Sequence, residues 1–367
     1  MSSILEKEED VLAQAAVNQT KEKSIKCFKL FFHGVQLNIR TNNSYINNSI
    51  RNILYLNGSS DKPAHYDFEL HEVSFLQGIY PHIKFSKKGD YQTIITDHDE
   101  TFYWKSNRFQ FVSKISRKEK RAVFYIKSAH FMRSDALIEC ALLYPLIFLM
   151  RSEGSYFVHS AAVAGKNGAV MISGPTLSGK TTLSLMLVQE KYRLLSDEAN
   201  VLSVKNGTVY IKGFPIKPKI KEINLPKFPV LIKHRSCLIE AEKQKFFFPL
   251  SVLKQNSRST SSSPLSLIIR PQYQLSGKLK ISKMSYSELF KLISDTNMYS
   301  KFGINSGDRL NYVLLSRLLY RDILAYNCQY SDDSTEDLVE FIGEQLENFE
   351  IIRGTETDQR VKVSMVL

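Results

Sequence analysis

Cysteine is scarce in this sequence, and the residues present lie far apart. Cys27, Cys140, Cys237 and Cys328 form no Cys-x-x-Cys pair among 367 residues, and the eight histidines do not cluster with them. This spacing argues against a structural zinc site and against a framework of disulfide bonds. Proteins without disulfide bonds are typical of reducing compartments, so we expect a cytoplasmic location.

Long apolar runs are also lacking. The longest, residues 136–150, contains Glu139 and is shorter than the roughly 20 residues that a helix needs to cross a bilayer. Residues 1–14 are acidic and have no apolar centre, which is unlike a signal peptide. We therefore expect no association with a membrane.

Positive charge is abundant, but no continuous basic stripe is present. The formal net charge is +12, and only short clusters occur, at residues 117–121 and 217–221. Such an excess fits an anionic ligand or an acidic partner. Because the remaining basic residues are scattered, nucleic acid is not an expected partner.

The strongest motif of the chain lies in residues 169–189. Residues 169–172 are an apolar run typical of a buried strand. Residues 174–181, GPTLSGKT, match G-x-x-x-x-G-K-[ST], and the apolar positions 183, 186 and 187 predict a helix after them. Strand, loop and helix in this order are the context that a phosphate-binding loop, or Walker A motif, requires.

Each part of this motif has a physical role toward a nucleotide. Glycines allow backbone angles at which successive N–H groups face a phosphate, and the helix N-terminus adds partial positive charge. Lys180 is placed to reach the β- and γ-phosphates, and the Thr181 hydroxyl to bind Mg²⁺. The predicted nucleotide contacts are Gly174, Pro175, Thr176, Leu177, Ser178, Gly179, Lys180, Thr181 and Thr182.

An Asn-Gly pair, residues 167 and 168, separates the loop strand from an apolar run before it. Asn-Gly between apolar runs is the strongest short signal for a hairpin. If this pair forms the turn, Val163 faces Ile172, and His159 lies beside Thr176 at the mouth of the loop. The loop strand is therefore expected to be antiparallel to its predecessor, unlike in ordinary phosphate-loop NTPases. A lone strand histidine is equally compatible with a structural role.

Two carboxylates follow the helix. Residues 193–196 predict a strand that ends at Asp197 and Glu198. A right-handed crossover would bring this strand end next to the phosphate loop. Carboxylates at that place can bind Mg²⁺ or accept a hydroxyl proton, although acidic residues also follow strands in solvated turns. The predicted metal ligands are Thr181, Asp197 and Glu198.

A second Asn-Gly pair, residues 206 and 207, lies between the runs 200–205 and 208–212. The same rule predicts a second hairpin. Its register sets Lys212 opposite Val201.

Together these residues resemble the HPr kinase/phosphorylase family, whose nucleotide fold is shared with phosphoenolpyruvate carboxykinase. The family has a histidine on the strand before the loop, the phosphate loop, and R-L-V-A-D-D after the helix. His159, the loop and residues 193–198, RLLSDE, occur here in that order. The resemblance covers residues 157–216, and it is closer to divergent relatives of modified-peptide biosynthesis than to the carbohydrate regulators. It implies that Asp197 is the catalytic base, with His159 near the phosphates and Lys180 holding them.

Some positions depart from the family. Glu198 replaces a second aspartate, and Tyr210 stands where the family has a glutamate often assigned to the metal. The loop reads Pro-Thr-Leu-Ser and not the Asp-Ser-Gly-Val type. These differences concern the metal geometry and the acceptor more than the nucleotide.

The fold class predicted from these patterns is α/β. It consists of a phosphate-loop kinase core of the HPr kinase/phosphoenolpyruvate carboxykinase type with a mixed sheet, preceded by a mainly antiparallel β domain. Residues 131–151 predict an apolar helix, broken or kinked at Pro145. Further helices are expected at 287–294, 308–326 and 335–352, and residues 213–235 read as an irregular lid or connector. The predicted divisions are a polar tail at 1–23, a β-rich domain at 24–130, the catalytic domain at 131–352 and a C-terminal tail at 353–367.

The expected function is that of an ATP-dependent, Mg²⁺-requiring kinase acting on a hydroxyl, with Ser or Thr of a peptide or protein as the acceptor. ATP is a default choice, because the chain has neither a Rossmann G-x-G-x-x-G nor an Asn-Lys-x-Asp guanine signature. Two alternatives stay open. One is a nucleotide-binding switch or scaffold that has lost transfer, which Tyr210 favours, and the other is a kinase of a small hydroxylated metabolite. The rings of the resembled family make a homo-oligomer a further expectation.

Overall fold

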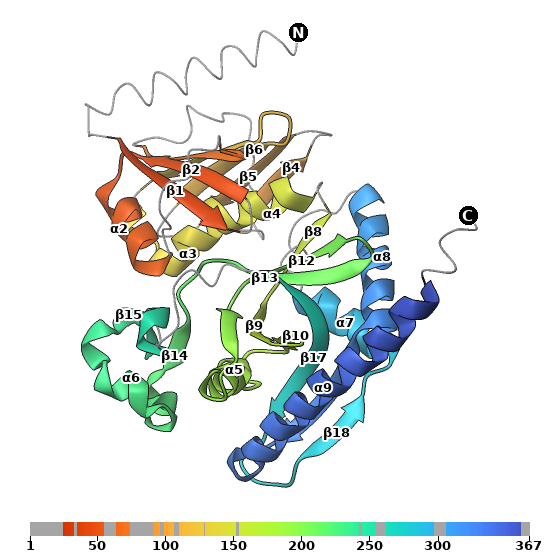
Figure 1. The fold of residues 1–367 in the computed structure, drawn as a ribbon. Coiled ribbons are helices and arrows are strands. Elements are labelled where there is room, and N and C mark those ends of the chain that lie inside the picture. Colours follow the sequence, from red (N-terminus) through yellow and green to blue (C-terminus); the bar gives the residue numbers. More distant parts are fainter. Residues whose placement is uncertain are drawn as a thin grey trace. The chain divides into compact units, whose positions relative to one another are not determined.

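The computed structural model divides the chain into two compact units, residues 1–153 and 154–367 (Figure 1). The predicted polar tail, 1–23, lies outside the residues that the structure describes. No helix in the described part is long and apolar enough to cross a membrane. The described residues are 25–32, 35–54, 64–73, 91–95, 99–105, 110–127, 129–151, 154–241, 244–253, 262–296 and 306–360.

The first unit contains a mixed sheet with the strand order β1-β2-β3-β7-β6-β5-β4. The pairs β2–β3 and β3–β7 are parallel, and the other neighbours are antiparallel. The bounds are β1 (Lys26–Phe32), β2 (Val35–Thr41), β3 (Tyr66–Glu72), β4 (Tyr91–Ile95), β5 (Asp99–Lys105), β6 (Gln110–Ser116) and β7 (Arg121–Lys127).

The parallel pairs were not predicted, and they follow from a helix that the sequence analysis missed. The helix α2 (Ser44–Ile53) connects β2 to β3 and so returns the chain to run in the same direction. The side chain of Asn43 caps its start by accepting a hydrogen bond from the Ile46 N–H. Ile46, Ile50 and Ile53 are buried at the spacing of one helix face.

The helical segment predicted for residues 131–151 is present and is interrupted near Pro145. It consists of α3 (Ser134–Ile138), the π-helical turn η2 (Glu139–Leu143) and α4 (Tyr144–Arg151). A change of helical register at this place accommodates Pro145, which has no N–H to donate. Because α4 packs against β6, the division between the units falls after these helices, whereas the predicted boundary lies between residues 130 and 131.

The second unit is built on a larger mixed sheet around the strand β17. One path through it is β11-β9-β10-β17-β13-β12-β8, and β19 joins β17 to β18. Both β10 and β19 are parallel to β17, whereas β9 is antiparallel to β10 and to β11. The bounds are β8 (Ser155–Val158), β9 (Ser160–Gly165), β10 (Gly168–Ser173), β11 (Arg193–Ser196), β12 (Asn200–Lys205), β13 (Thr208–Gly213), β17 (Ser263–Tyr273), β18 (Lys280–Lys283) and β19 (Leu324–Tyr330).

Helices cover this sheet (Figure 1). The helix α5 (Lys180–Gln189) packs on β9, β10 and β11, and α9 (Thr335–Arg360) packs on β17 and β19. The helices α7 (Tyr286–Thr296) and α8 (Ser306–Asp322) pack against one another. The helix predicted over 308–326 is therefore too long, because the chain enters the unpredicted strand β19 at Leu324. In contrast, α9 extends past the predicted end at 352.

Residues 213–235, predicted to be irregular, belong largely to a small regular subdomain. It contains a sheet of β14 (Lys219–Lys221), β16 (Lys245–Phe247) and β15 (Ile239–Ala241), together with α6 (Pro229–Lys233). Its buried residues, among them Ile220, Phe228 and Phe248, pack together with Leu185 of α5. The subdomain is thus anchored to α5, the helix that follows the loop 174–179.

Candidate functional site

The hairpin of β9 and β10 leads the chain into the loop, as predicted, but in a different register. Ile172 pairs with Ala161, and the predicted partner Val163 pairs with Val170. The turn lies one residue earlier than predicted, because Gly168 belongs to β10 at φ +129°. A Cβ at Gly168 would lie 2.0 Å from the hydroxyl oxygen of a β17 serine, so this glycine serves strand packing.

His159 nevertheless lies at the loop, between β8 and β9. Its backbone N–H donates to the carbonyl of Thr296 at 2.7 Å. Its ring Nδ1 lies 3.0 Å from the Glu198 carbonyl oxygen, and since a carbonyl only accepts, Nδ1 carries the proton of this bond. The histidine therefore connects the end of α7 with the segment that follows β11.

The loop, residues 174–179, has the shape of an anion cradle. Gly179 has φ +96°, and a Cβ there would lie 2.2 Å from the hydroxyl oxygen of Tyr330. Leu177 also has a positive φ, of 71°. Within the described part of the chain, no hydrogen bond takes up the backbone N–H groups of Thr176, Leu177 and Gly179. Donors left without acceptors in such a turn are available to an anion.

The ammonium group of Lys180 lies inside this cradle. Its Nζ donates to the carbonyl oxygens of Gly174 at 2.8 Å and Pro175 at 3.0 Å. Burial lowers the pKa of Lys180, while the nearby carboxylate of Asp197 acts in the opposite direction. A buried ammonium held only by neutral carbonyls is stabilised further when an anionic oxygen reaches it.

Asp197 directly follows β11 and lies beside the first turn of α5. The sequence analysis predicted this position, because a right-handed crossover brings the end of the strand next to the loop. Its Oδ2 accepts a hydrogen bond from the Thr181 hydroxyl at 3.0 Å, and the side chain is 4% exposed. Its Oδ1 is buried and has no hydrogen-bond partner among the described residues. Burial raises the pKa of Asp197 to about 8, the charge of Glu198 adds to this, and the Thr181 bond opposes it.

The predicted metal ligands come together only in part. The carboxylate of Glu198 lies 3.8 Å from the Lys219 ammonium, in a weak ion pair. Among the described residues, no group of three or more His, Cys, Asp and Glu side chains is suited to a metal ion. The Thr181 hydroxyl and the unpartnered Asp197 Oδ1 remain. These two oxygens fit Mg²⁺, which usually keeps waters and binds one or two protein oxygens together with substrate phosphates.

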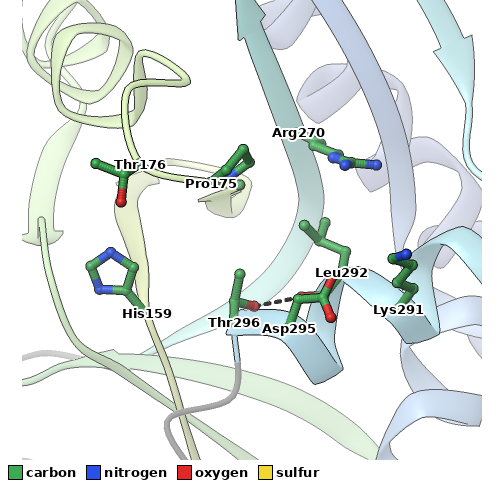
Figure 2. A pocket seen from close by; sticks show the side chains of 9 residues that line it. His159, Pro175, Thr176, Arg270, Lys291, Leu292, Asp295 and Thr296 are labelled. Atoms are coloured by element: carbon green, nitrogen blue, oxygen red, sulfur yellow. Dashed lines mark hydrogen bonds between the residues drawn. The ribbon is translucent and has the colours of Figure 1, made fainter.

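A pocket of about 310 Å³ opens on the other side of the loop strand. In Figure 2, His159 and Thr176 form one side of it, and Arg270 and Lys291 form the opposite side. Asp295 also lines it. The sequence analysis missed these last three residues. The only local signal is a charged residue, Arg270, at the end of the mostly apolar run 264–269.

Comparisons with known proteins add little to this geometry. No protein-family model matches the chain, and no curated protein matches it. Among solved structures, the Hpr(Ser) kinase/phosphatase from Coxiella burnetii is similar over 54% of this chain and 98% of that chain, with 11% identity and a TM-score of 0.28. A TM-score this low supports no inference about function, so the chemistry of the site follows from its own geometry.

Proposed function

We propose that this protein is a kinase that transfers the γ-phosphoryl group of ATP to a hydroxyl, with Ser or Thr of a peptide or protein as the acceptor. The observation that carries the proposal is the 3.0 Å bond between Thr181 and the buried Asp197, beside the ammonium of Lys180. A glycine loop, its lysine, its hydroxyl and a carboxylate at one place are the parts that phosphoryl transfer requires.

Binding of the nucleotide is the task of the loop and Lys180. The unused N–H groups of the loop would donate to the β- and γ-phosphates. Lys180 would exchange the carbonyls of Gly174 and Pro175 for phosphate oxygens. Thr181 and Asp197 would hold Mg²⁺, which would neutralise part of the phosphate charge.

Removal of the hydroxyl proton is the task of Asp197. The new bond forms between the acceptor oxygen and the γ-phosphorus, the bond from that phosphorus to the β,γ-bridging oxygen breaks, and the proton passes to the carboxylate. A carboxylate next to the γ-phosphate is within reach of the acceptor hydroxyl and can take its proton. His159, held by Glu198 and Thr296, would orient the groups at the mouth of the loop.

A nucleotide-binding switch without transfer is the second candidate. The observation that favours it is the position of Glu198, whose carboxylate faces Lys219 and leaves two protein oxygens for a metal. A site of this kind would bind Mg²⁺ and nucleotide and change conformation, with little turnover.

Incubation with γ-labelled ATP, Mg²⁺ and a random pool of Ser- and Thr-containing peptides tests the proposal. We expect label on peptide, and a loss of about 10²- to 10⁴-fold in Asp197→Asn because the base is removed. The affinity for ATP, measured by calorimetry, is expected to change little, and Glu198→Gln serves as the matched control with a smaller loss of transfer.

An Asp197→Asn variant with normal turnover would refute the assignment. Label that stays on ATP in the wild-type protein supports the switch, and label on an added small hydroxylated metabolite supports a metabolite kinase.

A further inference from the structure

We infer that the pocket between the loop strand and α7 recognises a carboxylate of the acceptor, bound by Arg270 and Lys291. The acceptor would then be a peptide with Asp or Glu next to the Ser or Thr that receives the phosphoryl group. That the bound peptide receives a phosphoryl group rests on the proposed function, whereas the recognition of an acidic peptide does not. The pocket adjoins Pro175 and Thr176, at the start of the loop that would hold the γ-phosphate.

Arg270 is positioned by the sheet. Ile172 of β10 pairs with Ile269 of β17, so Arg270 follows on β17 at the level where β10 ends and the loop begins. Its Nε is buried and forms no hydrogen bond with the described part of the chain. A buried arginine N–H without an acceptor lowers the stability of the folded protein. A carboxylate can accept two parallel hydrogen bonds from the planar guanidinium and so remove this cost.

Lys291 supplies the second cation, from α7. The neighbouring Leu292 and Ile293 are buried and fix the orientation of the helix. The last turn of α7 is held in place because the carbonyl of Thr296 accepts the backbone N–H of His159 at 2.7 Å. The side chain of Lys291 is exposed and makes no ion pair within 4.0 Å with another described residue. Its charge is therefore available to a ligand.

The remaining lining residues favour a peptide over a free phosphate. Asp295, four residues after Lys291 in α7, adds a negative charge that disfavours a ligand with only anionic groups. A peptide brings N–H donors for Asp295 and a carboxylate for Arg270. Among the described lining residues His159 is the only aromatic one. The net charge of +12 also fits an acidic partner.

Binding of two fluorescein-labelled peptides, followed by anisotropy without nucleotide, tests the inference. Both carry one central Ser in an Ala background, flanked on each side by Glu in the first and by Gln in the second. We expect the wild-type protein to bind the Glu peptide about tenfold more tightly or better, as charge-assisted hydrogen bonds allow. Lys291→Gln and Arg270→Gln are expected to remove this preference without weakening the Gln peptide.

The matched control is Lys280→Gln, which removes one exposed positive charge from β18, and it is expected to keep the preference. Lys291 is exposed, so its substitution tests the pocket even if Arg270→Gln lowers the melting temperature. Equal binding of the two peptides by the wild-type protein, or an equal loss of preference in Lys280→Gln, would overturn the inference. So would a fall in ATP affinity in Lys291→Gln with peptide binding unchanged, because it would assign the pocket to the nucleotide.

The anisotropy assay measures the preference between the two peptides without nucleotide, so it does not depend on phosphoryl transfer. A protein that prefers the Glu peptide but transfers no label therefore retains the inference and loses the proposed function. A protein that transfers label to both peptides equally retains the proposed function and loses the inference.

Discussion

The two sides of the phosphate loop differ in how their polar groups are satisfied. On the acid side, Thr181, Asp197 and Lys180 are largely buried and bonded to one another or to the loop, and Asp197 Oδ1 is their one buried oxygen without a hydrogen-bond partner among the described residues. On the pocket side, the buried Nε of Arg270 has no hydrogen-bond partner in the described part of the chain, and Lys291 makes no ion pair there, although the charge of Glu288 acts on Arg270. The difference fits the two proposals, in which the acid side binds a polyphosphate and the pocket side binds a ligand that brings its own negative charge.

Removing the ammonium on the acid side should have the largest effect on nucleotide binding. In Lys180→Ala the phosphates lose a charge-assisted donor, and we expect ATP affinity to fall by about 10- to 100-fold, with transfer falling further. Calorimetric titration with ATP and Mg²⁺ measures this loss. Lys291→Gln, on the pocket side, is expected to leave ATP affinity unchanged. Equal losses in both variants would erase the distinction between the two sides.

The loop between the two sides depends on a glycine. Gly179→Ala places a Cβ at φ +96° and 2.2 Å from the Tyr330 hydroxyl oxygen, so we expect destabilisation of about 1–2 kcal/mol from the backbone alone, plus the contact. Adding Tyr330→Phe removes the closest atom and should restore the part of the melting temperature that is due to the contact. An alanine variant with a wild-type melting temperature would contradict this account of the loop.

Titration of the acid side should produce a smaller, pH-dependent effect on stability. Because the folded-state pKa of Asp197 is raised from 3.8 to about 8, the folded protein holds a proton that the unfolded chain has lost. The resulting stabilisation is present below about pH 4 and is lost as the pH rises to about 8, by at most about 1.4 kcal/mol per pH unit. Asp197→Asn should lack this slope.

Thermal unfolding in EDTA, without nucleotide, measures the difference. The melting temperature of the asparagine variant should rise relative to wild type between pH 4 and 8. In Glu198→Gln the midpoint should move to lower pH, because the charge of Glu198 raises the Asp197 pKa. A constant difference between wild type and Asp197→Asn would show that Asp197 does not retain its proton in the folded protein.

Two Asn-Gly pairs show where local sequence signals suffice and where they fail. At residues 206 and 207 both φ angles are positive, 50° and 74°, and the predicted pairing of Val201 with Lys212 is confirmed. At residues 167 and 168 the glycine is required by β17, which approaches from nearly a hundred residues later in the chain, and the predicted register is wrong. A turn motif does not distinguish a glycine needed for the turn from one needed for packing.

The candidate site divides in the same way. The contact of Thr181 with Asp197 could be predicted from the sequence, because both residues lie in one strand–loop–helix–strand unit and such crossovers are right-handed. Arg270 and Lys291 come from elements far from the motif, and they have no spacing rule that joins them to it. Likewise, the parallel pairs of β3 depend on the helix α2. The sequence analysis missed this helix because it did not use the helical spacing of its three isoleucines.

His159 has a consequence that reaches beyond its own chemistry. Its backbone N–H donates a hydrogen bond to the carbonyl of Thr296 at the end of α7, and its ring donates one to the carbonyl of Glu198, the residue after Asp197. Two hydrogen bonds therefore connect α7, which lines the pocket, to the segment that contains Asp197. If the proposed nucleotide and acceptor both bind, this linkage would couple them, and by reciprocity each would change the affinity for the other.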